Sequence, residues 1–219
     1  MVPTMRTAAD FNQFYTAEDD PWHISRARFR DKGLRRSISK FVAGKSVLEL
    51  GCGEGHLTQS IFGESRIVTG VDISDIAIER AKARNIQNAR FENSDFLNVS
   101  FGGYDVITAI ECLYYLAPED QEVFFEKVAR EHSRKIMILS GPIIGENEHR
   151  KYFTHQGLLE AFARHGMDVI EFHNLNVYRT TALANIPAIL VRLPLGDWLL
   201  DYLPSNMVYQ RCYIIQIMI

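Results

Sequence analysis

The feature that most constrains this chain is a short apolar run that ends in three closely spaced glycines. Residues 46–50 (Ser-Val-Leu-Glu-Leu) are typical of a buried strand. Gly51, Gly53 and Gly55 follow, and they let the backbone approach a ligand closely. The dinucleotide fingerprint G-x-G-x-x-G would place its third glycine at position 56, where this chain has His56 and where we expect a helix to begin. The loop therefore favours a smaller ligand that has no phosphate.

After the glycine loop, apolar runs of strand length alternate with helical patterns. Such alternation predicts a parallel sheet with helical connections, a doubly wound α/β fold. The length of 219 residues suits one large domain, so we expect a single domain with a helical N-terminal lid over 1–44 and an apolar helical insertion over 177–207. The predicted strands are 46–50, 67–72, 89–92, 104–110, 135–140, 169–175 and 209–219, and the predicted helices are 25–41, 75–84, 119–132 and 154–165.

Charge and cysteine content exclude several classes of protein. The chain has 24 Lys and Arg against 27 Asp and Glu, a formal net charge of −3, so no basic field indicates a nucleic-acid or anionic-membrane partner. Hydrophobic residues make up 47%, which excludes a disordered chain. Cys52, Cys112 and Cys212 form no C-x-x-C pair, and their odd number fits a reducing compartment. Because residues 1–10 lack a signal-peptide pattern, we expect a cytoplasmic protein.

Two acidic residues follow strands at places where a nucleoside could be held. Asp72 ends the second predicted strand, and a carboxylate there can accept hydrogen bonds from both hydroxyls of a ribose. Asp95 and Phe96 follow the third predicted strand, where they could hold an exocyclic amine and flank a purine. Either acid could instead be a helix cap or a solvated side chain. Their order along the chain favours a ligand with a ribose diol.

These segments resemble the class I S-adenosylmethionine-dependent methyltransferases over about residues 40–175. Residues 47–55 are similar to the first motif of that family, 71–73 to its ribose acid, 94–96 to its adenine acid and 104–111 to its fourth strand. The resemblance implies a Rossmann-like, seven-stranded sheet in the order 3-2-1-4-5-7-6 with an antiparallel last strand, and S-adenosyl-L-methionine as cofactor, with S-adenosyl-L-homocysteine as product. The cofactor-binding residues that we expect are Trp22, Arg28, Glu49, Gly51, Cys52, Gly53, His56, Leu57, Asp72, Ile73, Ile76, Asp95, Phe96, Ile110 and Glu111.

Two shorter segments resemble a narrower group, the nodulation N-methyltransferase (NodS-like) family. They are residues 19–23 (Asp-Asp-Pro-Trp-His) and 110–116 (Ile-Glu-Cys-Leu-Tyr-Tyr-Leu). That family methylates an amino sugar of a chitin oligomer, so the resemblance implies a small-molecule or sugar acceptor with N-methylation favoured over O-methylation. Residues 177–207 depart from the pattern of the family.

Glu111 and Tyr115 are the predicted catalytic residues. Glu111 follows the fourth strand, at the edge where open α/β sheets bind ligands, and could accept the proton of an amine acceptor; it could instead cap the next segment. Tyr114 and Tyr115 follow, and we expect Tyr115 in the site and Tyr114 in the core. Trp22 could form a lid or simply pack.

Tyr15 and Arg28 could belong to the same lid, with the arginine reaching the methionine carboxylate. A solvated basic helix face is the simpler account of Arg28. The histidines offer no metal-binding motif, so we predict no metal site. His149 and His155 follow the fifth strand and could contact substrate, although a solvated loop explains them better. The other functions that fit are an O-methyltransferase, an NAD-dependent oxidoreductase, or a protein that binds the cofactor without catalysis.

The insertion at 177–207 contains two apolar runs around a Pro-Leu-Gly turn at 194–196. A helical hairpin of this composition has too much apolar surface to remain bare. We expect it to wall the acceptor pocket or to pair two subunits, and less so to bind a membrane surface, because it carries few cations.

Overall fold

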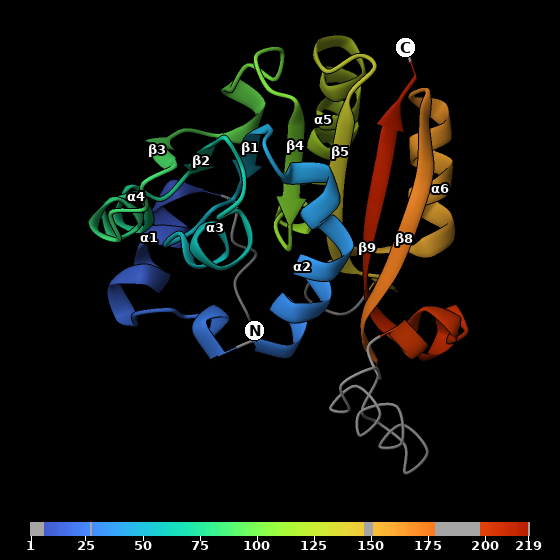
Figure 1. Ribbon diagram of the computed structural model, residues 1–219, viewed down its shortest axis with the longest axis horizontal. Coiled ribbons are helices and arrows are strands. Elements are labelled where there is room, and N and C mark those ends of the chain that lie inside the picture. The colour runs from blue at the N-terminus through green and yellow to red at the C-terminus, as the bar shows by residue number, and fades with distance from the viewer. Residues whose placement is uncertain (1–6, 27, 147–150, 178–197, 219) are drawn as a thin grey trace.

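The computed structural model describes residues 7–26, 28–146, 151–177 and 198–218. Its centre is a seven-stranded sheet in the order β3-β2-β1-β4-β5-β9-β8 (Figure 1). The first five strands of that order are parallel, and β9 runs antiparallel to both of its neighbours. The strands are β1 (Ser46–Leu50), β2 (Ile67–Asp72), β3 (Ala89–Asn93), β4 (Val106–Ile110), β5 (Ile136–Pro142), β8 (Met167–Val177) and β9 (Val208–Ile217). The predicted α/β fold and strand order are therefore confirmed.

Helices cover both faces of the sheet. Leu34 and Ile38 of α2 pack with Leu57 and Ile61 of α3 on one face. Residues of α5 and α6 pack with β9 on the other face, while α4 contacts α1, β2 and β3. The helices are α1 (Ala8–Ala17), α2 (Arg28–Val42), α3 (His56–Ile61), α4 (Asp75–Ala83), α5 (Pro118–Glu131) and α6 (His155–Arg164).

Five short 3₁₀ helices lie in the described connections between the larger elements. They are η1 (Ile24–Arg26), η2 (Phe96–Asn98), η3 (Leu113–Tyr115), η5 (Trp198–Tyr202) and η6 (Ser205–Met207). Two of them, η2 and η3, follow β3 and β4 directly, so they border the edge of the sheet at which those strands end. In Figure 1 the arrowhead of β4 points toward the N-terminal segment, which lies below the sheet in that view.

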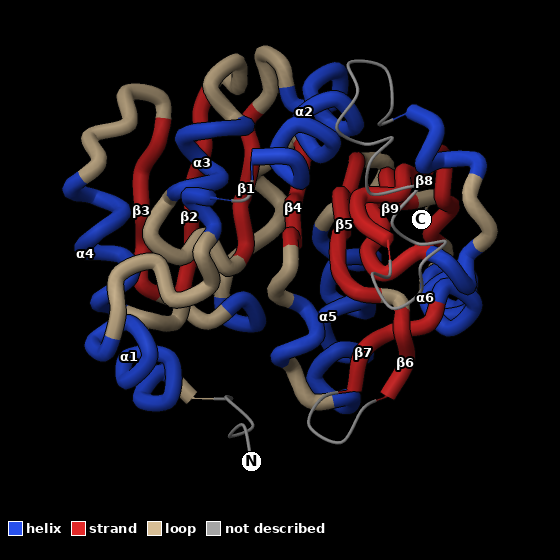
Figure 2. Tube along the Cα trace, turned by 90° about the horizontal axis from the view of Figure 1, so that it is seen from below, coloured by secondary structure: helices blue, strands red, loops and turns tan. Residues whose placement is uncertain are grey.

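The helix α1 falls within the helical lid expected over 1–44, although its bounds were not predicted, and one further element was not anticipated at all. The helix α1 begins with a capping box, in which Thr7 Oγ1 accepts from the Asp10 N–H at 3.3 Å and Asp10 accepts from the Thr7 N–H at 2.9 Å. A two-stranded hairpin of β6 (Ile144–Glu146) and β7 (Lys151–Thr154) precedes α6 and lies apart from the main sheet (Figure 2). Phe11 and Tyr15 of α1 line the cavity described below, whereas Phe153 of β7 packs against the core.

Most of the predicted insertion, residues 178–197, lies outside the described residues, so its helical hairpin stays a prediction. The part that is described, η5 and η6, is held to the sheet edge by Asp201. Its carboxylate accepts from the Asn174 N–H at 2.8 Å and lies 3.0 Å from His173 Nδ1. Within the described ranges, no helix has both the length and the apolar character that a membrane span requires.

Candidate active site

A cavity of about 240 Å³ lies where β1, β2 and β4 end, beneath the N-terminal segment. Most of the residues predicted for the site line this cavity, although they come from separate parts of the chain. The predicted residues that line it are Trp22, Gly51, Cys52, Gly53, His56, Leu57, Asp72, Ile73, Asp95, Phe96, Ile110, Glu111 and Tyr115. The strand ends thus bring the motif residues together, as expected for an open α/β sheet.

Two positions of the glycine loop, Gly51 and Gly53, cannot accept a side chain without strain. Gly51 has a φ of 66°, and a Cβ added there would lie 2.6 Å from the Cβ of Cys112. Gly53 has a φ of 52°, and its Cβ would lie 2.8 Å from the hydroxyl of Tyr15. A side chain at either position would be strained and would displace a residue that lines the cavity.

Asp72 is fixed at the floor of the cavity by backbone hydrogen bonds. Its two carboxylate oxygens accept from the N–H groups of Gly53 and Ser74, each at 2.9 Å. The side chain is largely buried, and burial raises the pKa of the carboxyl although these hydrogen bonds act in the opposite direction. Each oxygen has a further lone pair, so the group can still accept a hydrogen bond from a ligand hydroxyl.

Asp95 and Phe96 lie at the start of η2, after β3. Asp95 Oδ1 accepts from the Leu97 N–H at 2.8 Å and so caps the short helix. The cap and the ligand-binding interpretations are compatible, because Asp95 also lines the cavity and a carboxylate accepts several hydrogen bonds.

Glu111 adopts an unusual backbone conformation directly after β4. Its φ is 57°, in the left-handed region that residues with a side chain rarely adopt. The Glu111 N–H donates to the Ser140 carbonyl at 2.9 Å, and the Ser140 hydroxyl donates to Glu111 Oε1 at 2.8 Å. Both tyrosines that follow line the cavity, with ring centroids 4.7 Å apart. The expectation that Tyr114 lies in the core is therefore corrected: the turn of η3 directs both rings to the cavity.

Aromatic side chains of the N-terminal segment cover the cavity. The Trp22 indole N–H donates to the Tyr115 hydroxyl at 3.0 Å. The Trp22 ring packs against Tyr15 and Phe14, with centroids 5.1 and 6.0 Å away, and Phe11 meets Tyr115 edge-on at 5.3 Å. Phe11 was missed in the sequence, although its spacing to Phe14 and Tyr15 after the Thr7 cap marks one face of a helix.

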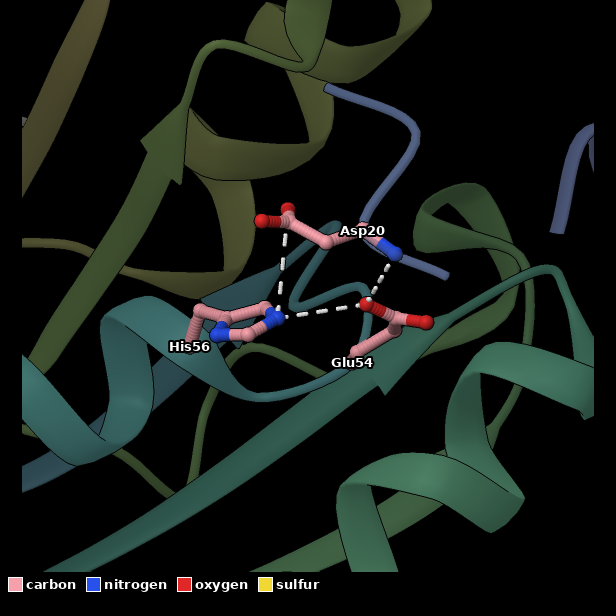
Figure 3. Close-up of side chains that lie close together, drawn as sticks. All are labelled: Asp20, Glu54 and His56. Carbon is pink, nitrogen blue, oxygen red and sulfur yellow. Dashed lines mark hydrogen bonds and ion pairs between the residues drawn. The ribbon is translucent and has the colours of Figure 1, made fainter. Parts of the chain in front are cut away.

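Asp20, Glu54 and His56 join this segment to the glycine loop (Figure 3). Glu54 Oε2 accepts from the Asp20 N–H at 3.0 Å and lies 3.2 Å from His56 Nε2. The three side chains are close enough to ligate a cation. Arg80 already donates to Glu54 at 2.6 Å and Arg84 lies 2.8 Å from His56, so two guanidinium groups supply the positive charge here.

Two predicted cofactor residues, Glu49 and Ile76, lie outside the cavity lining, and the side chain of a third, Arg28, is not described. Glu49 is buried behind the loop, where it accepts a hydrogen bond from Thr58 at 2.5 Å, and burial raises its pKa to about 8. Ile76 lies in the first turn of α4 and does not line the cavity. Arg28 begins α2, in a stretch whose side chains are outside the described part of the chain.

The histidines after β5 do not contribute to the cavity as far as it is described. His149 lies outside the described residues. His155 Nδ1 is 2.8 Å from the Tyr213 hydroxyl, and burial lowers its pKa. His155 therefore packs against the sheet, apart from the residues that line the cavity.

Comparison with known proteins finds methyltransferases similar to the segment that carries the motifs. Residues 47–132 match a family model described as a methyltransferase domain. The chain is 30% identical over 107 residues to Nodulation protein S of Azorhizobium caulinodans, an alignment that covers 47% of this chain and 52% of the relative. It is 34% identical over 87 residues to a ubiquinone biosynthesis O-methyltransferase of Coxiella burnetii, covering 37% of each. The chain thus spans about half the length of these relatives or less.

Solved structures share the fold over nearly the whole chain. N-methyltransferase NodS from Bradyrhizobium japonicum WM9, in complex with S-adenosyl-L-homocysteine, superposes with a TM-score of 0.66 at 16% identity and covers 97% of this chain and 98% of that chain. Magnesium protoporphyrin IX methyltransferase from Synechocystis PCC 6803, with the same compound bound, gives a TM-score of 0.64 at 13% identity and covers 94% and 91%. At these identities the structures establish the fold.

Proposed function

We propose that this chain, whose residues 47–132 match a family described as a methyltransferase domain, is a class I S-adenosylmethionine-dependent enzyme that transfers a methyl group to a small-molecule or sugar acceptor. One observation carries the proposal. Asp72, the glycine loop and Glu111 line a single cavity at the ends of the parallel strands. The residues that would bind a nucleoside and the carboxylate that could act on an acceptor therefore line the same cavity.

The residues present fit S-adenosylmethionine. Asp72 is preorganised by two backbone N–H groups and would accept hydrogen bonds from the ribose hydroxyls. Asp95 would accept a hydrogen bond from the exocyclic amine of the adenine, and the Phe96 ring would pack against the adenine ring. When bound, this cofactor supplies a methyl group on a positively charged sulfonium. The nearby carboxylates and aromatic rings of the cavity suit a cation.

The charge of the cavity favours an amine as the acceptor. Its described lining contains neither Lys nor Arg, and its carboxylates are Asp20, Glu54, Asp72, Asp95 and Glu111. Arg80 offsets the charge of Glu54, and Asp72 and Asp95 are assigned to the cofactor, so the carboxylate proposed to face the acceptor is Glu111. It would attract an amine and repel an anionic acceptor. The amine must lose a proton as its nitrogen gains the methyl group, and Glu111 would accept that proton while Tyr115 bounds the site. O-methylation of a neutral hydroxyl is the alternative, in line with the ubiquinone biosynthesis O-methyltransferases among the relatives.

The N-terminal residues 1–44 would act as a lid, with Trp22 above the acceptor. The hydrogen bond from Trp22 to Tyr115 supports this role, since it links the lid to the proposed catalytic tyrosine. Residues 177–207 would wall the acceptor side or pair two subunits. The three cysteines are free and buried, which is compatible with the cytoplasm.

Methyl transfer to paired acceptors tests the proposal. The protein would be incubated with S-adenosylmethionine labelled in its methyl group and, in separate reactions, with chitin oligomers that have one free amine, with the same oligomers fully N-acetylated, and with catechols. Label on the free-amine oligomer alone is expected. Label only on the catechol would support O-methylation. Cofactor binding without transfer in a single turnover, over a wide acceptor panel, would favour a non-catalytic binding protein.

A further inference from the structure

We propose that Ser140 is a positioning residue that holds the Glu111 carboxylate toward the transferred methyl group. This inference rests on the proposed function, because it assumes that Glu111 lies beside that methyl. Ser140 is in β5 and is 1% exposed, and it does not line the described cavity. It would act on the reaction only through Glu111.

The backbone of Glu111 gives the first argument. The left-handed conformation of Glu111 is strained for a residue with a side chain, so the surrounding structure must hold it. The parallel register pairs Ile110 with Ser140, and the Glu111 N–H extends that ladder by one bond to the Ser140 carbonyl. The chain then turns sharply at Glu111 into η3. The turn keeps the Glu111 side chain beside β5 instead of letting it follow the strand outward.

The hydroxyl of Ser140 gives the second argument. Among the other buried hydroxyls, Thr108 donates to the Leu48 carbonyl at 3.4 Å and Ser37 to the Gly33 carbonyl at 2.9 Å. Thr58 and Ser46 donate to the carboxylates of Glu49 and Asp105, which do not line the described cavity. Ser140 instead donates to a carboxylate that lines the cavity, at 2.8 Å. A hydrogen bond to a charged acceptor is stronger than one between neutral groups, and it fixes one of the two carboxylate oxygens. Ser140 thus limits both the rotamer and the reach of Glu111.

Sinefungin provides a test that does not require the acceptor. This analogue of S-adenosylhomocysteine carries a primary amine where the transferred methyl would be. A correctly held Glu111 carboxylate should pair with its ammonium, so calorimetry on the wild type is expected to give a dissociation constant about tenfold lower for sinefungin than for S-adenosylhomocysteine. We define the ratio as the dissociation constant of S-adenosylhomocysteine divided by that of sinefungin. This ratio reports on the interaction between the Glu111 carboxylate and the added amine.

Ser140→Ala should reduce that ratio about three- to tenfold and leave the affinity for S-adenosylhomocysteine unchanged. Glu111→Gln should bring the ratio close to one, and adding Ser140→Ala to it should change nothing more, since the two act as a unit. Thr108→Val is the matched control, because it removes a buried hydroxyl from the neighbouring strand and should keep the wild-type ratio. If Ser140→Ala does not fold, Ser140→Cys keeps the volume with a weaker donor and should also lower the ratio.

The outcomes separate the two proposals. A Ser140 variant that binds S-adenosylhomocysteine normally and keeps the wild-type ratio overturns the role of Ser140. A wild type without any affinity for S-adenosylhomocysteine overturns the proposed function instead. If the wild type binds that compound but Glu111→Gln leaves the ratio unchanged, Glu111 does not face the methyl group and the inference about Ser140 fails with it.

Discussion

At the scale of single residues, Asp72 is the side chain on which cofactor binding should depend most. In Asp72→Ala, two hydrogen bonds from ribose hydroxyls to a carboxylate would be lost, each worth about 1.5–3 kcal/mol. We therefore expect the dissociation constant for S-adenosylhomocysteine to rise at least about tenfold in calorimetry. Asp168→Ala removes an exposed carboxylate from β8, far from the cavity lining, and is the matched control. A folded Asp72→Ala protein with unchanged affinity would remove Asp72 from the ribose site.

The residues that could be predicted from the sequence are those whose role follows from local order. Asp72 ends β2, Asp95 comes soon after β3, and Gly51 and Gly53 follow β1, so the sequence pattern singled them out. Ser140 could not be found in this way. Its contact with Glu111 depends on the register between β4 and β5, which joins residues almost thirty positions apart and leaves no mark in either segment.

At the scale of elements, α1 is held over the site by Arg80 of α4. This guanidinium donates to Glu54 at 2.6 Å and to the carbonyl of Tyr15, in the last turn of α1, at 2.8 Å. Arg80→Gln should release α1, because both bonds lose their charged donor. Hydrogen exchange measured by mass spectrometry should speed up across residues 8–22 and remain unchanged in β4 and β5. Arg66→Gln, at an exposed ion pair, is the control. Equal exchange in both variants would refute the anchoring role.

The bounds of α1 and the hairpin of β6 and β7 escaped prediction for a physical reason. The capping box of α1 uses Asp10 in place of the usual Glu or Gln, and much of its apolar face packs on the site aromatics and not on the sheet core. The strands β6 and β7 are three and four residues long with an irregular register, so no alternating pattern develops.

At the scale of the whole molecule, the edge of the sheet should respond to pH through His173. Hydrogen bonding to Asp201 raises the pKa of His173, with Glu171 adding to the effect and Arg36 opposing it. A histidine whose pKa is higher in the folded state stabilises the fold at pH below its unfolded pKa of about 6.5, and this contribution is lost as pH rises through the folded pKa. Urea midpoints should therefore differ between wild type and His173→Gln at pH 5.5 and converge by pH 9.

Asp201→Asn should behave in the same way, because it removes the main partner of His173. A difference between wild type and His173→Gln that is independent of pH would assign His173 a packing role instead. Alternation of strands and helices predicted a parallel sheet, and the strand order of the whole sheet was predictable from the resemblance of the motifs to those of a known family. The course of residues 177–207 was not, because prolines divide its apolar runs and no motif fixes their partner.

Calorimetric titration of the wild-type chain with S-adenosylhomocysteine, beside a parallel titration with NAD, tests the central claim most directly. The account predicts one site per chain that binds S-adenosylhomocysteine in the micromolar range or tighter, with no heat from NAD, because His56 replaces the third glycine of a dinucleotide loop. Binding of NAD in preference to S-adenosylhomocysteine, or no binding of S-adenosylhomocysteine by a folded chain, would contradict it.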